Sequence, residues 1–201
     1  MVKKENGLSK IKITYNNIEF DSQEECDFYF YLEEIQTSGY IDSFNYHPEP
    51  FKLSEPVTYK WISFNKNEKV ENVSTLLRQH IYTHDFQINW NTKAKGIFYY
   101  NLEDNVKLDK IPFIAQKDIS LVEIKPAFDV NASIRTFVIN QKWVMKDYNK
   151  YINKIIPTGN TKCLFAKTFV PELARYTKKK HQLKKFKYPV HTLEEFINGS
   201  N

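Results

Sequence analysis

Hydrophobic and polar positions alternate with a period of two along several short stretches, which is the pattern of half-buried β-strands. The clearest stretch is "HIYTHDFQINW" at 80–90, where Tyr82, His84 and Phe86 share one face and Asp85 lies on the other. The run "ISLVEIK" is almost continuously apolar, which is typical of a buried strand. Strands are expected at 11–20 (a hairpin turning at Asn16-Asn17), 40–47, 57–64, 80–90, 119–125 and 162–169.

Other stretches repeat their apolar positions every three to four residues, as amphipathic helices do. In "DSQEECDFYFYLEEIQTSG", Ser22 is a helix cap, Glu25 is its capping-box partner and Gly39 ends the helix. Helices are expected at 22–38, 131–156 and 171–187, with short ones at 72–79 and after Thr192. This order predicts an α/β fold, a mixed β-sheet flanked by helices, in a single domain spanning 1–201. The polar stretches 65–79 and 91–118 are candidates for substrate selection.

The composition is that of an ordinary globular protein, with 41% hydrophobic and 26% charged residues among 201. The amino end has no apolar signal sequence, and no apolar run reaches the about 18 residues of a membrane span. The two cysteines, Cys26 and Cys163, match no metal-ligand spacing and are expected to be buried thiols. We therefore expect a cytoplasmic protein without a membrane partner.

The net charge is +5, which permits a polyanionic partner without requiring one. Basic residues gather in "RYTKKKHQLKKFKYP" at 175–189, which is either a solvated helix face or a surface that follows a DNA backbone. Lys142 is a further phosphate-contact candidate. The expected DNA-binding residues are Lys142, Arg175, Lys178, Lys179, Lys180, Lys184 and Lys185.

Candidate chemistry lies in "LVEIKP", where Glu123 and Lys125 share one face of a strand that Pro126 ends. If Asp85 lies on a neighbouring strand, two carboxylates meet there and repel each other unless a cation lies between them. Mg²⁺ prefers such oxygen ligands. The alternatives are a surface ion pair for Glu123 and Lys125, a surface polar residue for Asp85, and simple helix capping for Glu25.

This arrangement resembles the PD-(D/E)XK nuclease superfamily. Asp85 in "YTHDF" stands where that family has its metal-binding aspartate, and Glu123 and Lys125 in "VEIKP" stand as its E-x-K pair. The helix "FDSQEECDFYFYL" looks like the preceding helix of these enzymes, whose acidic residue often completes the metal site. Glu25 matches that residue best, with Glu24 as the alternative. Within the superfamily, the chain is similar to phage head-completion and TnsA-type endonucleases and to small phage Holliday-resolvase-like nucleases.

The resemblance implies a restriction-endonuclease-like sheet and a Mg²⁺-dependent DNA endonuclease in which Mn²⁺ is expected to substitute. Asp85, Glu123, the Ile124 carbonyl and Glu25 would be metal ligands, and Lys125 would position or activate the attacking water. The DNA substrate stays open between branched junctions, DNA ends and plain duplex, and junction resolution would require a symmetric homodimer. The alternative is a catalytically inactive nuclease-fold DNA-binding protein that acts in packaging or assembly.

Overall fold

The computed structural model describes residues 13–66, 68–102, 112–127, 134–177 and 182–199. At its centre is a four-stranded mixed sheet in the order β12-β11-β8-β3. Strand β11 pairs antiparallel with β8 and parallel with β12, and β8 pairs antiparallel with β3. The strands are β3 (Ile41–Tyr46), β8 (Phe86–Trp90), β11 (Ile119–Ile124) and β12 (Ile152–Ile155).

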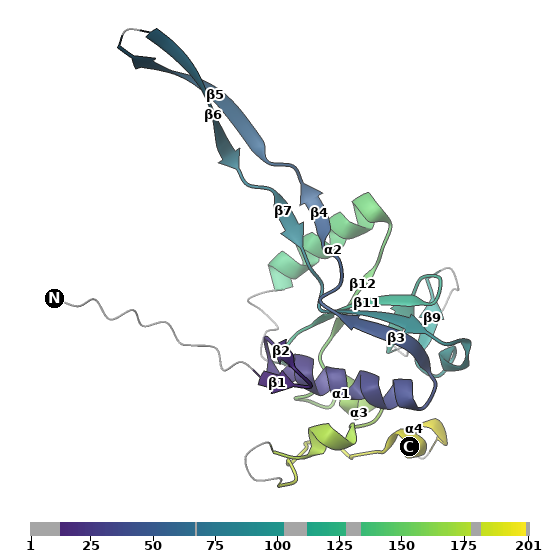
Figure 1. The fold of residues 1–201 in the computed structure, drawn as a ribbon. Coiled ribbons are helices and arrows are strands. Elements are labelled where there is room, and N and C mark those ends of the chain that lie inside the picture. Colours follow the sequence, from purple (N-terminus) through teal and green to yellow (C-terminus); the bar gives the residue numbers. More distant parts are fainter. Residues whose placement is uncertain (1–12, 67, 103–111, 128–133, 178–181, 200–201) are drawn as a thin grey trace, which may run out of the picture.

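Helices cover both faces of this sheet (Figure 1). Helix α1 (Gln23–Thr37) packs its apolar side chains, with those of the carboxy-terminal segment, against Phe86, Val122 and Ile124. Helix α2 (Ile134–Tyr148) packs Phe137 and Val144 against the side that carries Leu121. The alternation along β11 therefore places Leu121 and Glu123 toward the α2 side and their neighbours toward α1. The mixed α/β fold predicted from the sequence is confirmed.

The elements around α1 follow their sequence signals. Strands β1 (Ile13–Tyr15) and β2 (Ile18–Phe20) form the expected hairpin, and Asn16 and Asn17 both have positive φ, as a tight hairpin turn requires. Ser22 caps α1 by accepting a hydrogen bond from the Glu25 amide at 3.2 Å. After the helix the chain passes through Gly39, whose φ of +77° suits glycine.

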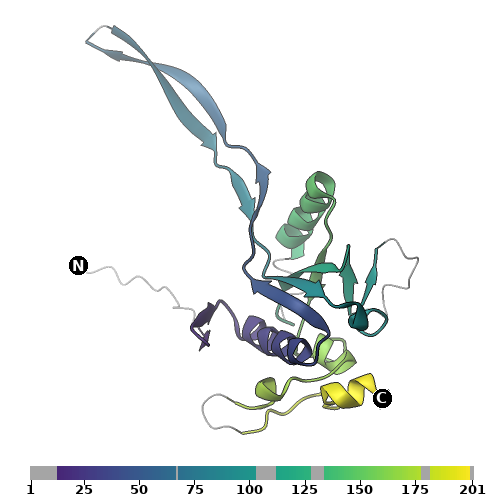
Figure 2. The same ribbon diagram turned by 45° about the vertical axis from the view of Figure 1, so that its right-hand side comes forward.

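Strands β4 (Phe51–Ser54) and β7 (His80–Tyr82) pair with each other and lead into a long hairpin of β5 (Val57–Asn65) and β6 (Glu68–Leu77). This hairpin, hereafter the arm, projects away from the body of the protein (Figures 1 and 2). The short helix expected at 72–79 is therefore wrong. Its residues complete the second strand of the arm because they find strand partners in β5. The strand expected at 80–90 is interrupted at 83–85, between β7 and β8.

The excursion predicted at 91–118 contains short elements. The 3-10 helix η1 (Thr92–Ala94) comes first, and β9 (Tyr99–Asn101) pairs parallel with β10 (Phe113–Ala115).

The carboxy-terminal part corrects three expectations. The helix expected at 131–156 ends at Tyr148, because Asn149 takes a φ of +52° and the following residues join the sheet as β12. The strand expected at 162–169 is instead the short helix α3 (Leu164–Lys167). The basic helix expected at 171–187 is wrong in its described parts, 171–177 and 182–187, which contain the 3-10 turn η3 (Glu172–Arg175) and a Tyr176–Leu183 bridge.

The short helix after Thr192 is confirmed as α4 (Leu193–Ile197), with a complete capping box. None of the helices in the described ranges is long and apolar enough to cross a membrane.

Candidate metal centre

The centre of the candidate site is the end of β11, which extends past the end of its neighbour β8. The last register pair between the two strands is Val122 with Phe86. Beyond it, the Ile124 amide donates to Asp85 Oδ2 at 2.6 Å, so a carboxylate takes the position of a strand carbonyl. On the other edge, the Lys125 amide donates to the Ile155 carbonyl of β12 at 2.9 Å. Because β8 begins only at Phe86, Asp85 lies just outside that strand and against the last residues of β11.

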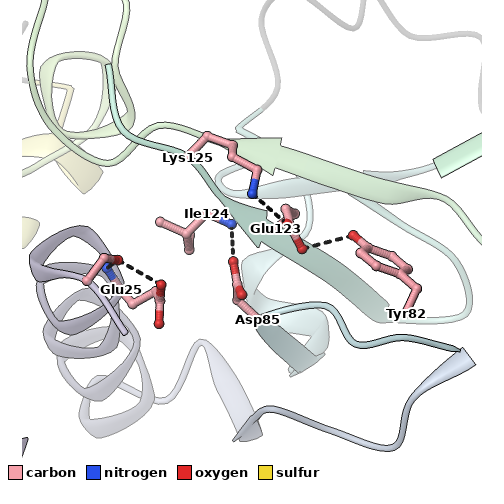
Figure 3. Close-up of polar contacts among 7 residues, drawn as sticks. Glu25, Tyr82, Asp85, Glu123, Ile124 and Lys125 are labelled. Atoms are coloured by element: carbon pink, nitrogen blue, oxygen red, sulfur yellow. Dashed lines mark hydrogen bonds and ion pairs between the residues drawn. The ribbon is translucent and has the colours of Figure 1, made fainter. Parts of the chain in front are cut away.

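Glu123 is buried, with 7% of its surface exposed, and both of its carboxylate oxygens have donors. Lys125 Nζ donates to Oε1 at 2.7 Å, and the Tyr82 hydroxyl donates to Oε2 at 2.9 Å. Figure 3 shows these contacts beside Asp85. The Glu123–Lys125 pair is therefore held inside the protein, and the surface ion pair considered from the sequence does not describe it.

Glu25 approaches from the first turn of α1 and is also 7% exposed. Ser22 Oγ donates to its Oε1 at 2.7 Å, and the Tyr46 hydroxyl donates to its Oε2 at 2.6 Å. The Ser22 cap is confirmed, but the Glu25 carboxylate accepts from the Ser22 hydroxyl and the Asp21 amide, which is not the pattern of the expected capping box. The same side chain also faces the site (Figure 3). Of Glu25 and Glu24, the two glutamates that the sequence offered for this position, Glu25 raises the pKa of Asp85 through its negative charge.

The site carries an excess of negative charge, with three carboxylates and one ammonium group at the end of the sheet. Burial and the nearby Glu123 carboxylate raise the pKa of Asp85 to about 8, and Glu25 adds to this effect. The Ile124 amide and Lys125 act in the opposite direction. Burial and Glu123 also raise the pKa of the Tyr82 hydroxyl, which keeps it a hydrogen-bond donor.

The residue set fits a hard divalent cation in its chemistry. Carboxylate and carbonyl oxygens are the ligands that Mg²⁺ prefers, and a cation would relieve the repulsion that raises the Asp85 pKa. The expected ligands Asp85, Glu123, the Ile124 carbonyl and Glu25 lie at the junction of β11, β8 and α1. In the described ranges, the group of three whose ligand atoms all lie within 4.8 Å of one another is instead Asp21, Glu25 and His47.

Sequence reasoning missed four residues at or beside this site. Tyr82 and Tyr46 hold the two glutamates, and Asp21 and His47 stand next to Glu25. The alternation around Tyr82 marked it as buried, but no pattern indicated that its hydroxyl reaches Glu123. His47 has positive φ and directly follows β3, so its position depends on the turn after that strand.

The expected DNA-binding residues divide into three groups. Lys142 on α2 and Lys185 are exposed. Arg175 donates hydrogen bonds from both Nε and Nη2 to the Val170 carbonyl, and Lys184 forms an ion pair with the buried Asp27 at 3.3 Å. These two side chains therefore hold the carboxy-terminal segment in place. Lys178, Lys179 and Lys180 lie outside the described residues.

Two other sequence features lie apart from the site. The Gln141 side-chain amide donates to the Ile152 carbonyl at 2.6 Å, which ties α2 to β12. A hollow of about 410 Å³ opens between the 91–118 excursion and the end of α2, and its lining includes Gln116, Leu121 and Tyr148. None of the four candidate catalytic side chains lines it.

Comparison with known proteins gives one similarity. Residues 7–99 match the model of a family described as "Protein of unknown function (DUF1064)". The matched part covers less than half of the chain and contains α1 and Asp85 but not β11. No match was found among curated proteins or among solved structures.

Proposed function

We propose that the protein is a metal-dependent DNA endonuclease of the PD-(D/E)XK type. The observation that carries this proposal is that Asp85 accepts a hydrogen bond from the Ile124 amide, between Glu123 and Lys125, and that the charges of Glu123, Glu25 and Lys125 all act on it. Burying like charges together is unfavourable, and such arrangements are typical of sites that bind cations or carry out acid–base chemistry. The order of an acidic helix, an Asp directly before a strand, an E-x-K strand and an amphipathic helix supports the same class.

In this proposal Asp85, Glu123 and the Ile124 carbonyl hold Mg²⁺ or Mn²⁺, and Glu25 completes the site. The bound ion would supply a water of lowered pKa and a Lewis acid on the phosphoryl oxygen. Lys125 positions the attacking water and stabilises negative charge on the phosphate, because its Nζ lies on the same strand face as Glu123. The Tyr82 hydroxyl fixes the rotamer of Glu123.

The proposed DNA contacts are the exposed Lys142 and Lys185, with Lys178, Lys179 and Lys180 as further contacts expected from the sequence. These lysines would neutralise phosphates and position the duplex without reading its sequence. We leave Arg175 and Lys184 out of this surface, because both have partners inside the protein. A cytoplasmic location is part of the proposal, and two buried cysteines that form no disulfide, Cys26 and Cys163, are compatible with it.

The test is a cleavage assay with Mg²⁺, run in parallel on a four-way junction, a flap, a linear duplex and single-stranded DNA. We expect Asp85→Asn and Glu123→Gln to lower cleavage by at least about 100-fold, since each removes a ligand charge. Asp147→Asn is the matched control, because it removes an exposed carboxylate of α2. Undiminished cleavage by the double Asp85→Asn/Glu123→Gln variant would refute the site.

One observation favours the alternative of an inactive DNA-binding protein of nuclease fold. Both Glu123 oxygens already accept hydrogen bonds, from Lys125 and Tyr82, so the carboxylate is satisfied by the protein alone. Calorimetry with Mg²⁺ and Mn²⁺ separates the two functions. Binding that is lost in Asp85→Asn supports the enzyme, whereas DNA binding without any metal binding supports the alternative.

A further inference from the structure

The arm is a two-stranded sheet that stands apart from the core. Its strands pair from Val57–Leu77 at the base to Asn65–Glu68 near the tip, with one register shift between Val57 and Thr58, over a length of about 30 Å. Among the described strands, β5 and β6 pair only with each other. Neither hydrophobic cluster of the described residues includes a side chain between 55 and 79. The body of the protein therefore does not explain why the arm is ordered.

Both faces of the arm expose apolar side chains. Successive side chains of a strand point to opposite faces, so Tyr59 and Trp61 of β5 lie on one face of the arm and Ile62 and Phe64 lie on the other. Isolated two-stranded hairpins are marginal in water, and an exposed apolar strand edge is a pairing hazard. The exposed apolar side chains of the arm, with 39–69% of their surface accessible, are Val57, Tyr59, Trp61, Ile62, Phe64, Val70, Val73, Leu76 and Leu77.

The exposed apolar area is large enough for a stable interface. The nine exposed fractions together correspond to about five fully exposed apolar residues, which is on the order of 900 Å² if aliphatic residues are counted near the lower end of the about 150–250 Å² of an aromatic one. A standard protein–protein interface buries about 800 Å² on each partner. The arm therefore provides the area of one side of such an interface when both of its faces are covered.

We infer that the arm is the dimerisation element of this protein, and that it packs against a second copy of the chain. The arm carries three lysines, Lys60, Lys66 and Lys69, against two glutamates, Glu68 and Glu71, whereas the whole chain has a net charge of +5. Two arms therefore meet with little mutual repulsion. Each offers both charge signs to the other, and Lys60 and Glu71 lie 3.8 Å apart within one arm.

The same charge balance argues against DNA as the occupant. A DNA-binding arm gains its affinity from phosphate neutralisation, which requires a clear excess of basic side chains. Six of the nine exposed apolar residues are aliphatic, and aliphatic side chains offer no ring for stacking on bases. A second copy would cover the exposed apolar side chains, offer opposite charges to those of the arm and occupy its open strand edges. Two copies related by a two-fold axis form a closed contact of this kind.

The experiment measures the mass of the full-length protein by sedimentation equilibrium, without DNA or divalent cations. We expect a mass near twice the 24.0 kDa chain at a concentration on the order of 10 μM. The double variant Trp61→Lys/Phe64→Lys places a charge on each face of the arm and should weaken dimerisation by at least about 10-fold. The control Leu173→Lys/Leu183→Lys adds the same charge at side chains that are 52% and 69% exposed outside the arm, and it should stay dimeric.

A second variant removes the arm, with Asn-Gly in place of residues 55–79. Ser54 and His80 are paired across β4 and β7, so a two-residue turn can join them. This variant should be monomeric. A monomeric wild type at all concentrations, or a dimer that persists in both arm variants, would overturn the inference. A monomeric wild type whose DNA affinity falls when the arm is removed would identify a DNA-binding arm instead.

This inference does not depend on nuclease activity, because its readout is mass alone. If the protein cleaves no DNA but dimerises through the arm, the proposed function fails and the inference stands. If it cleaves DNA as a monomer, the outcome is the reverse.

Discussion

Replacing Asp85 with asparagine should stabilise the metal-free protein at neutral pH and should flatten its pH dependence. Asparagine retains a side-chain oxygen that can accept the hydrogen bond from the Ile124 amide, so the end of β11 keeps its partner. What the substitution removes is the ionisation of a half-buried carboxyl group near Glu123 and Glu25. The effect on stability therefore depends on the protonation of Asp85.

The sign and size follow from the pKa of Asp85, which is about 8 in the folded protein against a usual value of 3.8. The stability contributed by protonated Asp85 is fully present below the usual pKa of 3.8, and it is lost as the pH rises through the pKa of about 8 in the folded protein. The loss amounts to about 1.4 kcal/mol per pH unit, which gives about 2–3 kcal/mol between about pH 5 and pH 7. Asparagine does not titrate and suffers no such loss.

The measurement is urea unfolding of wild type and Asp85→Asn at several pH values in the presence of a chelator. The difference in unfolding free energy between the two proteins should grow as the pH rises. Asp147→Asn, which changes an exposed carboxylate, should track the wild type. A difference between Asp85→Asn and wild type that stays constant from about pH 5 to pH 8 would show that Asp85 does not hold its proton, and the reasoning would be wrong.

Three further substitutions test the surroundings of the site. Ser22→Ala should cost about 1 kcal/mol in thermal or urea unfolding, because it removes the α1 cap and a donor to Glu25; an unchanged midpoint would contradict the capping role. Gly159→Ala should destabilise by about 1–3 kcal/mol in urea, since φ is +131° and the new Cβ would lie 2.4 Å from that of Ala127. His84→Leu should leave stability equal or raise it by about 1 kcal/mol, because both buried ring nitrogens lack partners in the described structure; a large loss would reveal a hidden partner. It should also remove the loss of stability on acidification from about pH 6.5 to pH 4, since burial lowers the pKa of His84 to about 4.

The sequence predicted the elements whose signals are local. Ser22 and Gly39 marked the limits of α1, the pair Asn16-Asn17 marked the first hairpin, and an almost continuous apolar run marked β11. These signals act within a few residues, so no distant contact can easily override them.

The failures occur where distant contacts decide the structure. Residues 72–77 belong to a strand because β5 lies beside them, although a short helix was expected at 72–79. Residues 152–155 leave the predicted helix to pair with β11, at the far end of α2. The basic run at 171–187 was expected to form a helix. Arg175 instead binds the Val170 carbonyl and Lys184 binds Asp27, and these contacts hold the described part of the segment in a non-helical conformation.

The candidate site was only partly predictable for the same reason. Spacing placed Glu123 and Lys125 on one face, and the expected meeting with Asp85 occurs at the strand end. The tyrosines that hold the glutamates come from other elements, and only the three-dimensional arrangement reveals them.

The hydrogen bond between the Ile124 amide and Asp85 gives this protein a built-in spectroscopic reporter. The proton and nitrogen chemical shifts of a backbone amide depend strongly on whether its acceptor is charged. The nuclear magnetic resonance signal of Ile124 should therefore move as Asp85 gains or loses its proton, and it should move again when a cation takes up the same carboxylate. A single labelled amide would then follow the occupancy of the site directly, without any substrate.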